Sequence, residues 1–198
     1  YLLENYREEL FQHFEDIGTE LLSTVVNDFV PLNLRLSRAR QLCKFLQLAP
    51  NEANKSFRIH VKHLFSKLPY VLRNAGDYDF QTNIVEAIFR MTSSAQRAKM
   101  VTKWFPYVDC TTHALFIRII DFDPDCRHFL NSLNKSLGKH QGVFSIPCEK
   151  ACIGQIELLK PQVASYEKFW IDFNMGSRSI LILCQKKGTK TQVTDVTI

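Results

Sequence analysis

The sequence predicts an α+β protein, in which a helical N-terminal part precedes an antiparallel β part. Up to about residue 141, apolar residues recur at helical spacing between Gly and Pro residues. From Val143 onward, short apolar or alternating runs replace that pattern. The clearest of them, residues 169–173 and 180–183, predict two strands joined by a tight Asn/Gly turn. We therefore expect a helical domain over residues 1–141 and a β domain over residues 142–198.

Gly, Pro and Asp residues delimit the predicted helices. Gly18 predicts a break after the first helix, Pro69 predicts a kink or break, and Gly76 predicts a left-handed cap. Asp77 or Asp79 is expected to cap the helix that follows. The predicted helices cover residues 3–14, 19–29, 33–48, 57–72, 80–91, 95–105, 112–120 and 125–137. Their aromatic residues are expected in the core, because apolar stripes at helical spacing normally bury.

Helices this short, joined by a few residues each, fit either a compact bundle or an α-solenoid of stacked hairpins. No crisp internal repeat chooses between the two. Strands are predicted over residues 143–146, 153–158, 169–173, 180–183 and 192–198. Alternation along the run from Phe169 to Phe173 predicts an antiparallel sheet with two unequal faces.

Composition places the chain among globular proteins. Its 198 residues are 45% hydrophobic and 23% charged, without an apolar run long enough for a membrane span and without a signal peptide. A soluble intracellular protein is therefore expected. The chain begins at Tyr1 rather than Met and ends on a strand-like run, so we expect it to be part of a longer protein. Its six scattered cysteines are expected to be reduced thiols, and no matched Cys or His pairs predict a metal.

Charge is distributed unevenly along the chain. Residues 1–28 carry seven carboxylates against Arg7 alone, whereas residues 29–76 carry nine Lys and Arg residues against Glu52 alone. The basic block could meet an acidic partner such as nucleic acid, a histone acidic surface or an acidic peptide. Alternatively, it is a solvated helix face that pairs with the preceding acidic helices. The best candidates for partner binding are Arg35, Arg38, Arg40, Lys44, Lys62 and Lys67.

The sequence holds no catalytic constellation. Residues 188–191, Gly-Thr-Lys-Thr, lack the upstream glycine of a phosphate loop, and neither a Gly-x-Ser-x-Gly nor a His-Glu-x-x-His motif occurs. Asp121, Asp123 and Asp125 resemble half a calcium loop, but Pro124 interrupts them and the loop glycine is missing. We expect no enzymatic activity, no cofactor and no small-molecule substrate.

Several separated motifs, in order along the chain, carry a resemblance to a known family. They are Gly76-Asp77-Tyr78-Asp79-Phe80-Gln81, Ile84-Val85-Glu86-Ala87, Arg90-Met91-Thr92, Trp104-Phe105, Asp125-Cys126-Arg127, Phe129-Leu130-Asn131, Pro147-Cys148, Phe169-Trp170-Ile171-Asp172-Phe173-Asn174 and Gly176-Ser177. Together they resemble the N-terminal region of synaptonemal complex protein 2 and its 2-like paralogue. The match runs from about Gly76 to Leu183, while the expected tryptophan near Gln192 is absent.

The resemblance implies an armadillo-like helical domain followed by a pleckstrin-homology-like domain, truncated here, similar to the middle domain of the large FACT subunit. It implies a non-enzymatic structural role at the meiotic chromosome axis and lateral element, in the nucleus. The implied partners are axis and centromere proteins, with synaptonemal complex protein 3 bound through a C-terminal region outside this chain. Histone or DNA binding is the alternative function.

Overall fold

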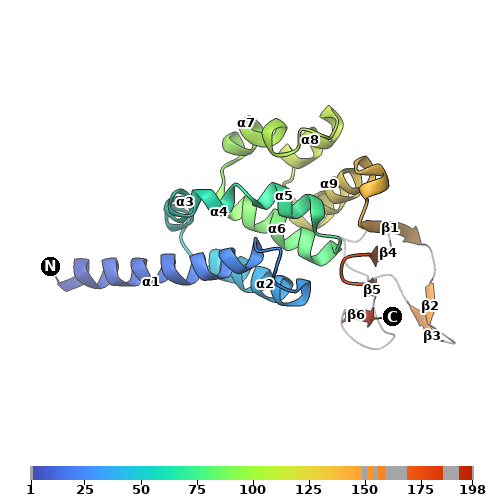
Figure 1. Cartoon of the computed structure of the whole chain (residues 1–198), viewed down its shortest axis with the longest axis horizontal. Helices are drawn as coiled ribbons and strands as arrows, with labels where there is room; N and C mark the ends of the chain where they lie inside the picture. The colour runs from blue at the N-terminus through green and yellow to red at the C-terminus, as the bar shows by residue number, and fades with distance from the viewer. Residues whose placement is uncertain (1, 149–150, 154–155, 159–168, 185–191, 198) are drawn as a thin grey trace. The chain divides into compact units, whose positions relative to one another are not determined.

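The protein has an α+β fold, as the sequence predicts (Figure 1). The structure, a computed structural model, describes residues 2–148, 151–153, 156–158, 169–184 and 192–197, which hold nine α-helices and six strands. The chain divides into two compact units. We call residues 1–74 and 79–105 the helical unit, and residues 75–78 and 106–198 the mixed unit. The expected boundary after residue 141 separates helices from strands, and as a boundary between folding domains it stays a prediction.

The helical unit contains helices α1 to α7, except for the first residue of α6. Their bounds are α1 Leu2–Val25, α2 Leu32–Leu48, α3 Asn51–His60, α4 Lys62–Phe65, α5 Leu68–Asn74, α6 Tyr78–Met91 and α7 Ser94–Trp104. Helix α7 begins with a capping box, in which Ser93 and Gln96 exchange hydrogen bonds with each other's backbone N–H groups. No helix in the described part of the chain is long and apolar enough to cross a membrane.

The predicted break at Gly18 is wrong, because Gly18 lies inside the continuous helix α1. A Cβ atom at this position would lie 2.6 Å from Cζ of Phe57, a fully buried residue of α3. Glycine therefore serves close helix packing here rather than a turn. The predicted second helix also ends too late, since α1 stops at Val25 and Phe29 lies in the following turn.

The predicted helix over residues 57–72 is three shorter helices, α3 to α5. Pro69 is the second residue of α5, where a missing backbone N–H leaves no helical hydrogen bond unmade. Gly76 follows α5 with φ of 61°, which confirms the left-handed conformation expected there. Apolar side chains of α6 form the centre of the helical unit, with Phe80, Ile84 and Ile88 almost fully buried.

The mixed unit packs two helices and a short 3₁₀ turn with the strands. The bounds are α8 Cys110–Ile117, α9 Phe122–Ser136, η1 Gly138–His140, β1 Val143–Cys148, β2 Ala151–Ile153, β3 Ile156–Leu158, β4 Phe169–Asn174, β5 Ser179–Cys184 and β6 Gln192–Thr197. Strands β1, β4, β5 and β6 form an antiparallel sheet in the order β1-β4-β5-β6. The predicted hairpin is confirmed as β4 and β5, and the predicted last strand as β6, although Ile198 lies outside the described residues.

The single strand predicted over residues 153–158 is wrong. Strands β2 and β3 are an antiparallel pair in which Ile153 lies opposite Ile156, while Gly154 and Gln155 lie outside the described residues. A short alternating run fits one strand and two shorter strands equally well, so its periodicity could not separate them.

The sheet has two unequal faces, as expected. One face carries pairs of apolar residues, Phe144 opposite Phe173 and Ile146 opposite Ile171. At one end of this face Phe169 and Ile182 are buried with Leu158 of β3. The opposite face mixes apolar and polar residues: Val143 and Leu181 are buried there, and Asp172 is fully buried opposite Ser145.

Candidate partner-binding surfaces

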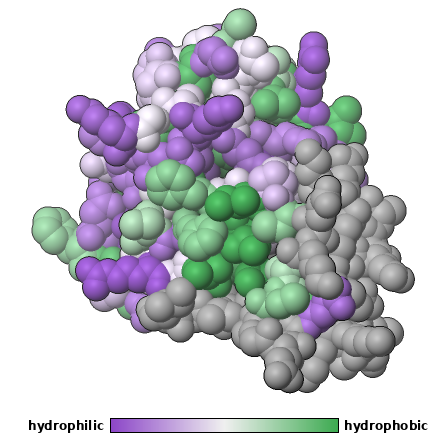
Figure 2. Space-filling view, turned by 90° about the vertical axis from the view of Figure 1, so that its right-hand side faces the viewer, coloured by the Kyte–Doolittle hydropathy of each residue, from purple (hydrophilic) through white to green (hydrophobic). Residues whose placement is uncertain are grey.

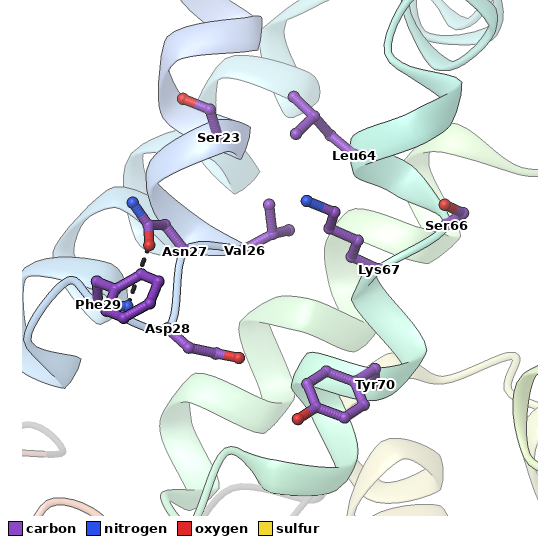
Figure 3. Close-up of a pocket in the computed structure, with 9 residues that line it drawn as sticks. All are labelled: Ser23, Val26, Asn27, Asp28, Phe29, Leu64, Ser66, Lys67 and Tyr70. Carbon is purple, nitrogen blue, oxygen red and sulfur yellow. Dashed lines mark hydrogen bonds between the residues drawn. The ribbon is translucent and has the colours of Figure 1, made fainter.

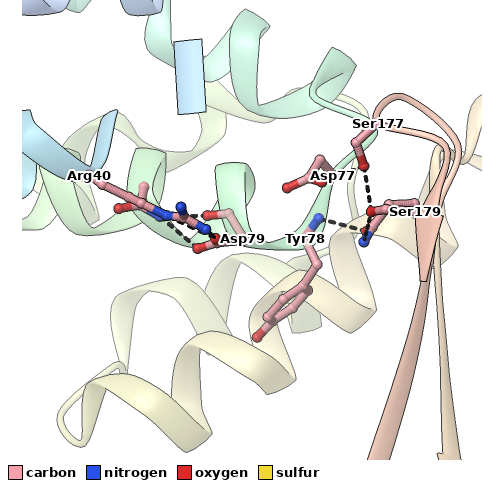
Figure 4. A network of polar contacts seen from close by, with 8 residues as sticks. Arg40, Asp77, Tyr78, Asp79, Ser177 and Ser179 are labelled. Atoms are coloured by element: carbon pink, nitrogen blue, oxygen red, sulfur yellow. Dashed lines mark hydrogen bonds and ion pairs between the residues drawn. The ribbon is translucent and has the colours of Figure 1, made fainter. Parts of the chain in front are cut away.

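Two of the six predicted partner-binding residues pair within the helical unit. The Arg35 side chain is only 11% exposed, lies 3.0 Å from Asp28, donates to the Val25 carbonyl oxygen and stacks over Phe80. Arg40 donates to the Asp79 carboxylate (Figure 4). Both guanidinium groups therefore have carboxylate partners within the unit, of which only Asp28 belongs to the acidic block of residues 1–28.

The other four predicted residues are more open. Arg38 donates to the Gln41 side chain at 2.8 Å. Lys44, Lys62 and Lys67 are exposed, and none of the three has an ion pair with another described residue. The structure thus gives two of the six, Arg35 and Arg40, carboxylate partners, bonds Arg38 to a neutral amide, and leaves the charge of the three lysines facing solvent. Whether the six residues bind a partner stays a prediction.

A groove of about 630 Å³ opens in the helical unit (Figure 3). One wall is the end of α1 and the turn that follows it, and the other is the segment from α4 to α5. Its lining residues are Ser23, Val26, Asn27, Asp28, Phe29, Leu64, Ser66, Lys67 and Tyr70. Val26 and Leu64 are buried, whereas Phe29 is 100% and Tyr70 60% exposed. The groove therefore joins an apolar floor to two solvent-facing aromatic rings.

Phe29 and Tyr70 correct the expectation that the helical aromatic residues lie in the core. That expectation holds for Phe57, Phe80 and Phe105, which are fully buried. The signal that could have identified Phe29 is the preceding Asn27-Asp28 pair, since Asn and Asp favour turns. Tyr70 carries a spacing signal, because it lies three residues after exposed Lys67 and off the buried stripe that contains Leu68.

Within the mixed unit, three glycines bring separate segments into close contact. The N–H of Gly176 donates to the carbonyl oxygen of Gly76 at 2.7 Å, and the N–H of Met175 donates to that of Gly142 at 2.9 Å. A Cβ atom on Gly76, Gly142 or Gly176 would lie within 3.0 Å of backbone atoms of the facing segment. We call this the glycine contact.

Polar side chains that lie near Gly76 and Gly176 in the sequence make further hydrogen bonds between the same segments (Figure 4). Ser177 Oγ donates to Asp77 Oδ2 at 2.6 Å and lies 2.8 Å from Ser179 Oγ. The backbone N–H of Tyr78 donates to Asn174 Oδ1 at 2.9 Å, which gives the first residue of α6 a partner for its free N–H.

A buried ion pair lies in the same unit. Arg127 of α9 donates to Asp172 Oδ1 at 2.6 Å, and their side chains are 9% and 1% exposed. Ser145 Oγ also donates to this oxygen at 2.5 Å. The guanidinium lies 3.5 Å from the centre of the Tyr78 ring, so its charge is stabilised by a carboxylate and a ring face.

The apolar face of the sheet is partly open. Phe144, Ile146 and Phe173 are 41%, 48% and 36% exposed. In the space-filling view, hydrophobic residues gather in one area of the face turned to the viewer (Figure 2).

No candidate metal site appears in the described part of the chain. It contains no group of three or more His, Cys, Asp or Glu residues that could hold a metal ion. The buried Cys43 thiol donates to the Asn83 carbonyl oxygen at 3.1 Å, and burial raises its pKa, so it stays protonated. The five described cysteines other than Cys184 are free thiols.

Comparisons with known proteins identify the family. A family model described as the synaptonemal complex 2 Spt16M-like domain matches residues 143–198. The chain is 36% identical over 172 residues to synaptonemal complex protein 2 of Homo sapiens, an alignment that covers 85% of this chain. The chain belongs to the synaptonemal complex protein 2 family. It is also 34% identical over 176 residues to the 2-like protein of Mus musculus, which covers 88% of this chain.

A solved structure supports the same family. A synaptonemal complex protein matches with a TM-score of 0.72 and 30% identity over 85% of this chain. The chain spans 11% of the human relative, 21% of the mouse 2-like relative and 43% of the solved chain.

The motifs that carried the resemblance meet in space. Tyr78, Arg127 and Asp172 come from three separate motifs and form one contact cluster. Gly76 and Gly176, from two of the same motifs, form the glycine contact. These family motifs therefore make contacts between distant segments of the mixed unit.

Proposed function

We propose that this chain is a non-enzymatic docking module of the meiotic chromosome axis, within the lateral element of the synaptonemal complex. Membership of the synaptonemal complex protein 2 family carries the proposal, because the relatives are named as proteins of that complex. The chain would then act in the nucleus on meiotic chromosomes. Its partners would be axis and centromere proteins, with synaptonemal complex protein 3 bound by a C-terminal region outside this chain.

The proposed architecture is an armadillo-like helical domain followed by a pleckstrin-homology-like domain similar to the FACT middle domain. Short consecutive helices joined by brief turns support the first part, and a four-stranded antiparallel sheet supports the second. Both kinds of domain bind proteins through extended surfaces and loops, so neither needs a catalytic cleft.

Exposed lysines suggest where an acidic partner would bind. Reversing Arg35 or Arg40 would leave Asp28 or Asp79 without its cation, so such variants would mix folding effects with binding effects. A cleaner test reverses Lys44, Lys62 and Lys67 together and measures pull-down of axis and centromere proteins by the 198-residue chain. Reduced capture by a folded variant would support an acidic partner, and unchanged capture would remove these lysines from the proposal.

Histone or DNA binding is the second candidate, favoured by the same unpaired lysines. Titration of the chain with nucleosomes and with free DNA at several salt concentrations separates the two candidates. Phosphate contacts would make the affinity fall steeply as salt rises, since each contact releases counterions. Capture of axis proteins without measurable DNA or nucleosome affinity would contradict the second candidate.

A further inference from the structure

The groove between α1 and the α4–α5 segment is large enough to hold the side chains of a bound ligand. Small-molecule sites in proteins are concave and mostly apolar, with a few placed polar groups, and they commonly enclose about 300–1,000 Å³. The groove encloses about 630 Å³ above the buried side chains of Val26 and Leu64. This space admits a few side chains of a bound segment but not a whole domain.

The turn that carries Phe29 is held in place. Asn27 Oδ1 accepts the backbone N–H of Phe29 at 3.0 Å, and the N–H of Val30 donates to the Asn27 carbonyl oxygen at 3.1 Å. Asp28, which lies between Asn27 and Phe29, pairs with Arg35 at 3.0 Å. Because the backbone of this turn is already fixed, covering the Phe29 ring costs the freedom of its side-chain torsions but no ordering of the turn. Tyr70 stands at the same groove, and aromatic residues dominate the energy of many interfaces.

The charges that line the groove favour an acidic ligand. Asp28 pairs with Arg35 at 3.0 Å, which offsets its negative charge at the groove. Lys67 lies in the turn between α4 and α5, and its side chain extends toward the wall formed by α1 (Figure 3). No described carboxylate pairs with Lys67, and exposed Lys62 and His63 lie five and four residues before it in the sequence. The groove thus offers one unpaired ammonium beside apolar and aromatic surface.

We infer that this groove binds an extended segment of a partner protein in which a bulky apolar side chain lies next to Asp or Glu residues. The apolar side chain would cover Val26 and Leu64 and contact the ring of Phe29. A neighbouring carboxylate would pair with Lys67. The inference rests on the proposed docking function, because it identifies the chemistry of one docked partner.

Fluorescence anisotropy with a labelled peptide tests the inference directly. The probe is a peptide of about twelve residues with one Phe among Asp, Glu and Ser residues. Two control peptides replace the Phe by Ser, or all acidic residues by Lys. The 198-residue chain should bind the probe and bind both control peptides at least about tenfold more weakly.

Matched variants of the chain locate the binding. Lys67→Glu should weaken probe binding at least about tenfold, and Phe29→Ser about fivefold or more. Lys103→Glu makes the same charge change on exposed α7, outside the groove, and should change the affinity less than about twofold. Both groove residues are exposed, so these variants should fold, which circular dichroism checks.

Several results would overturn the inference. They are no binding of the probe, equal binding of the Phe-less peptide, or equal losses from Lys67→Glu and Lys103→Glu. A wild-type dimer that Lys67→Glu dissociates would replace the partner segment by a second copy of this chain.

The pull-down of axis and centromere proteins is measured with the same variants. Wild-type capture that persists in Lys67→Glu and Phe29→Ser would reject the groove and keep the proposed function. If the wild-type chain bound the probe but captured no axis or centromere protein, the groove would be kept and the proposed function rejected.

Discussion

The groove of the helical unit and the glycine contact of the mixed unit are both built by segments that are distant in sequence. They differ in whether their polar and aromatic groups have partners within the chain. At the glycine contact, backbone groups of residues 76, 142, 175 and 176 are hydrogen-bonded across the contact. Around the groove, a fully exposed Phe29 and an unpaired Lys67 face solvent. Satisfied groups stabilise a fold, whereas exposed aromatic rings beside unpaired charge are typical of surfaces that bind another molecule.

The largest expected effect is at the buried ion pair near the glycine contact. Arg127→Met should lower the free energy of unfolding by about 3–5 kcal/mol, because it leaves the buried Asp172 carboxylate without its cation. Urea unfolding followed by circular dichroism measures the loss.

Arg90→Met is the matched control for that pair. Arg90 pairs with Glu86 on α6, and their side chains are 30% and 27% exposed, so the loss should stay below about 1 kcal/mol. If both variants lost the same free energy of unfolding, the Arg127–Asp172 pair would contribute no more stability than a surface ion pair. Adding Asp172→Leu to Arg127→Met should recover part of the loss, since no buried charge then remains.

The glycine contact itself predicts a difference between two alanine variants. Gly76 and Gly138 both have positive φ, 61° and 53°, so alanine at either position costs about 1–2 kcal/mol of backbone strain. Gly76→Ala would also place its Cβ 2.9 Å from backbone atoms of Gly176, whereas Gly138→Ala would meet no atom within 4 Å. We expect Gly76→Ala to destabilise by about 1–3 kcal/mol more than Gly138→Ala. Equal shifts of the unfolding midpoint would show that the segments do not pack this closely.

A third variant tests how closely α1 packs against α3 at Gly18, before α1 reaches the groove. Gly→Ala inside an exposed helix normally stabilises by about 1 kcal/mol. Gly18→Ala should instead destabilise by about 1–3 kcal/mol, because its Cβ would overlap the buried Phe57 ring. A rise in the free energy of unfolding would mean that α1 and α3 lie farther apart.

The smallest expected effect is at the groove. Phe29→Ser and Tyr70→Ser should change the free energy of unfolding by no more than about 0.5 kcal/mol, because both rings are largely solvent-exposed. Thermal and urea unfolding of the two variants measure it. A loss above about 1 kcal/mol would mean that the rings are covered within the chain, and the contrast with the glycine contact would disappear.

Much of this fold could be predicted from local patterns. The hairpin of β4 and β5, the cap at Gly76 and most helices were predicted, because periodicity and turn residues act over a few residues. The packing role of Gly18 was not predicted, since a glycine needed for packing and a glycine that ends a helix look alike in sequence. The candidate site was predicted only as a basic block. Folding gave Arg35 and Arg40 internal partners and left Lys67 open beside two aromatic rings.

The sequence by itself determined the α+β class, the change from helices to strands and the family, since each depends on composition, periodicity or ordered motifs. Only the tertiary structure decided that Gly76 meets Gly176, that Arg127 neutralises Asp172, and that Phe29 faces solvent. These outcomes depend on which distant segments pack together. Burial and charge pairing are properties of those contacts, so they become visible only once the chain has folded.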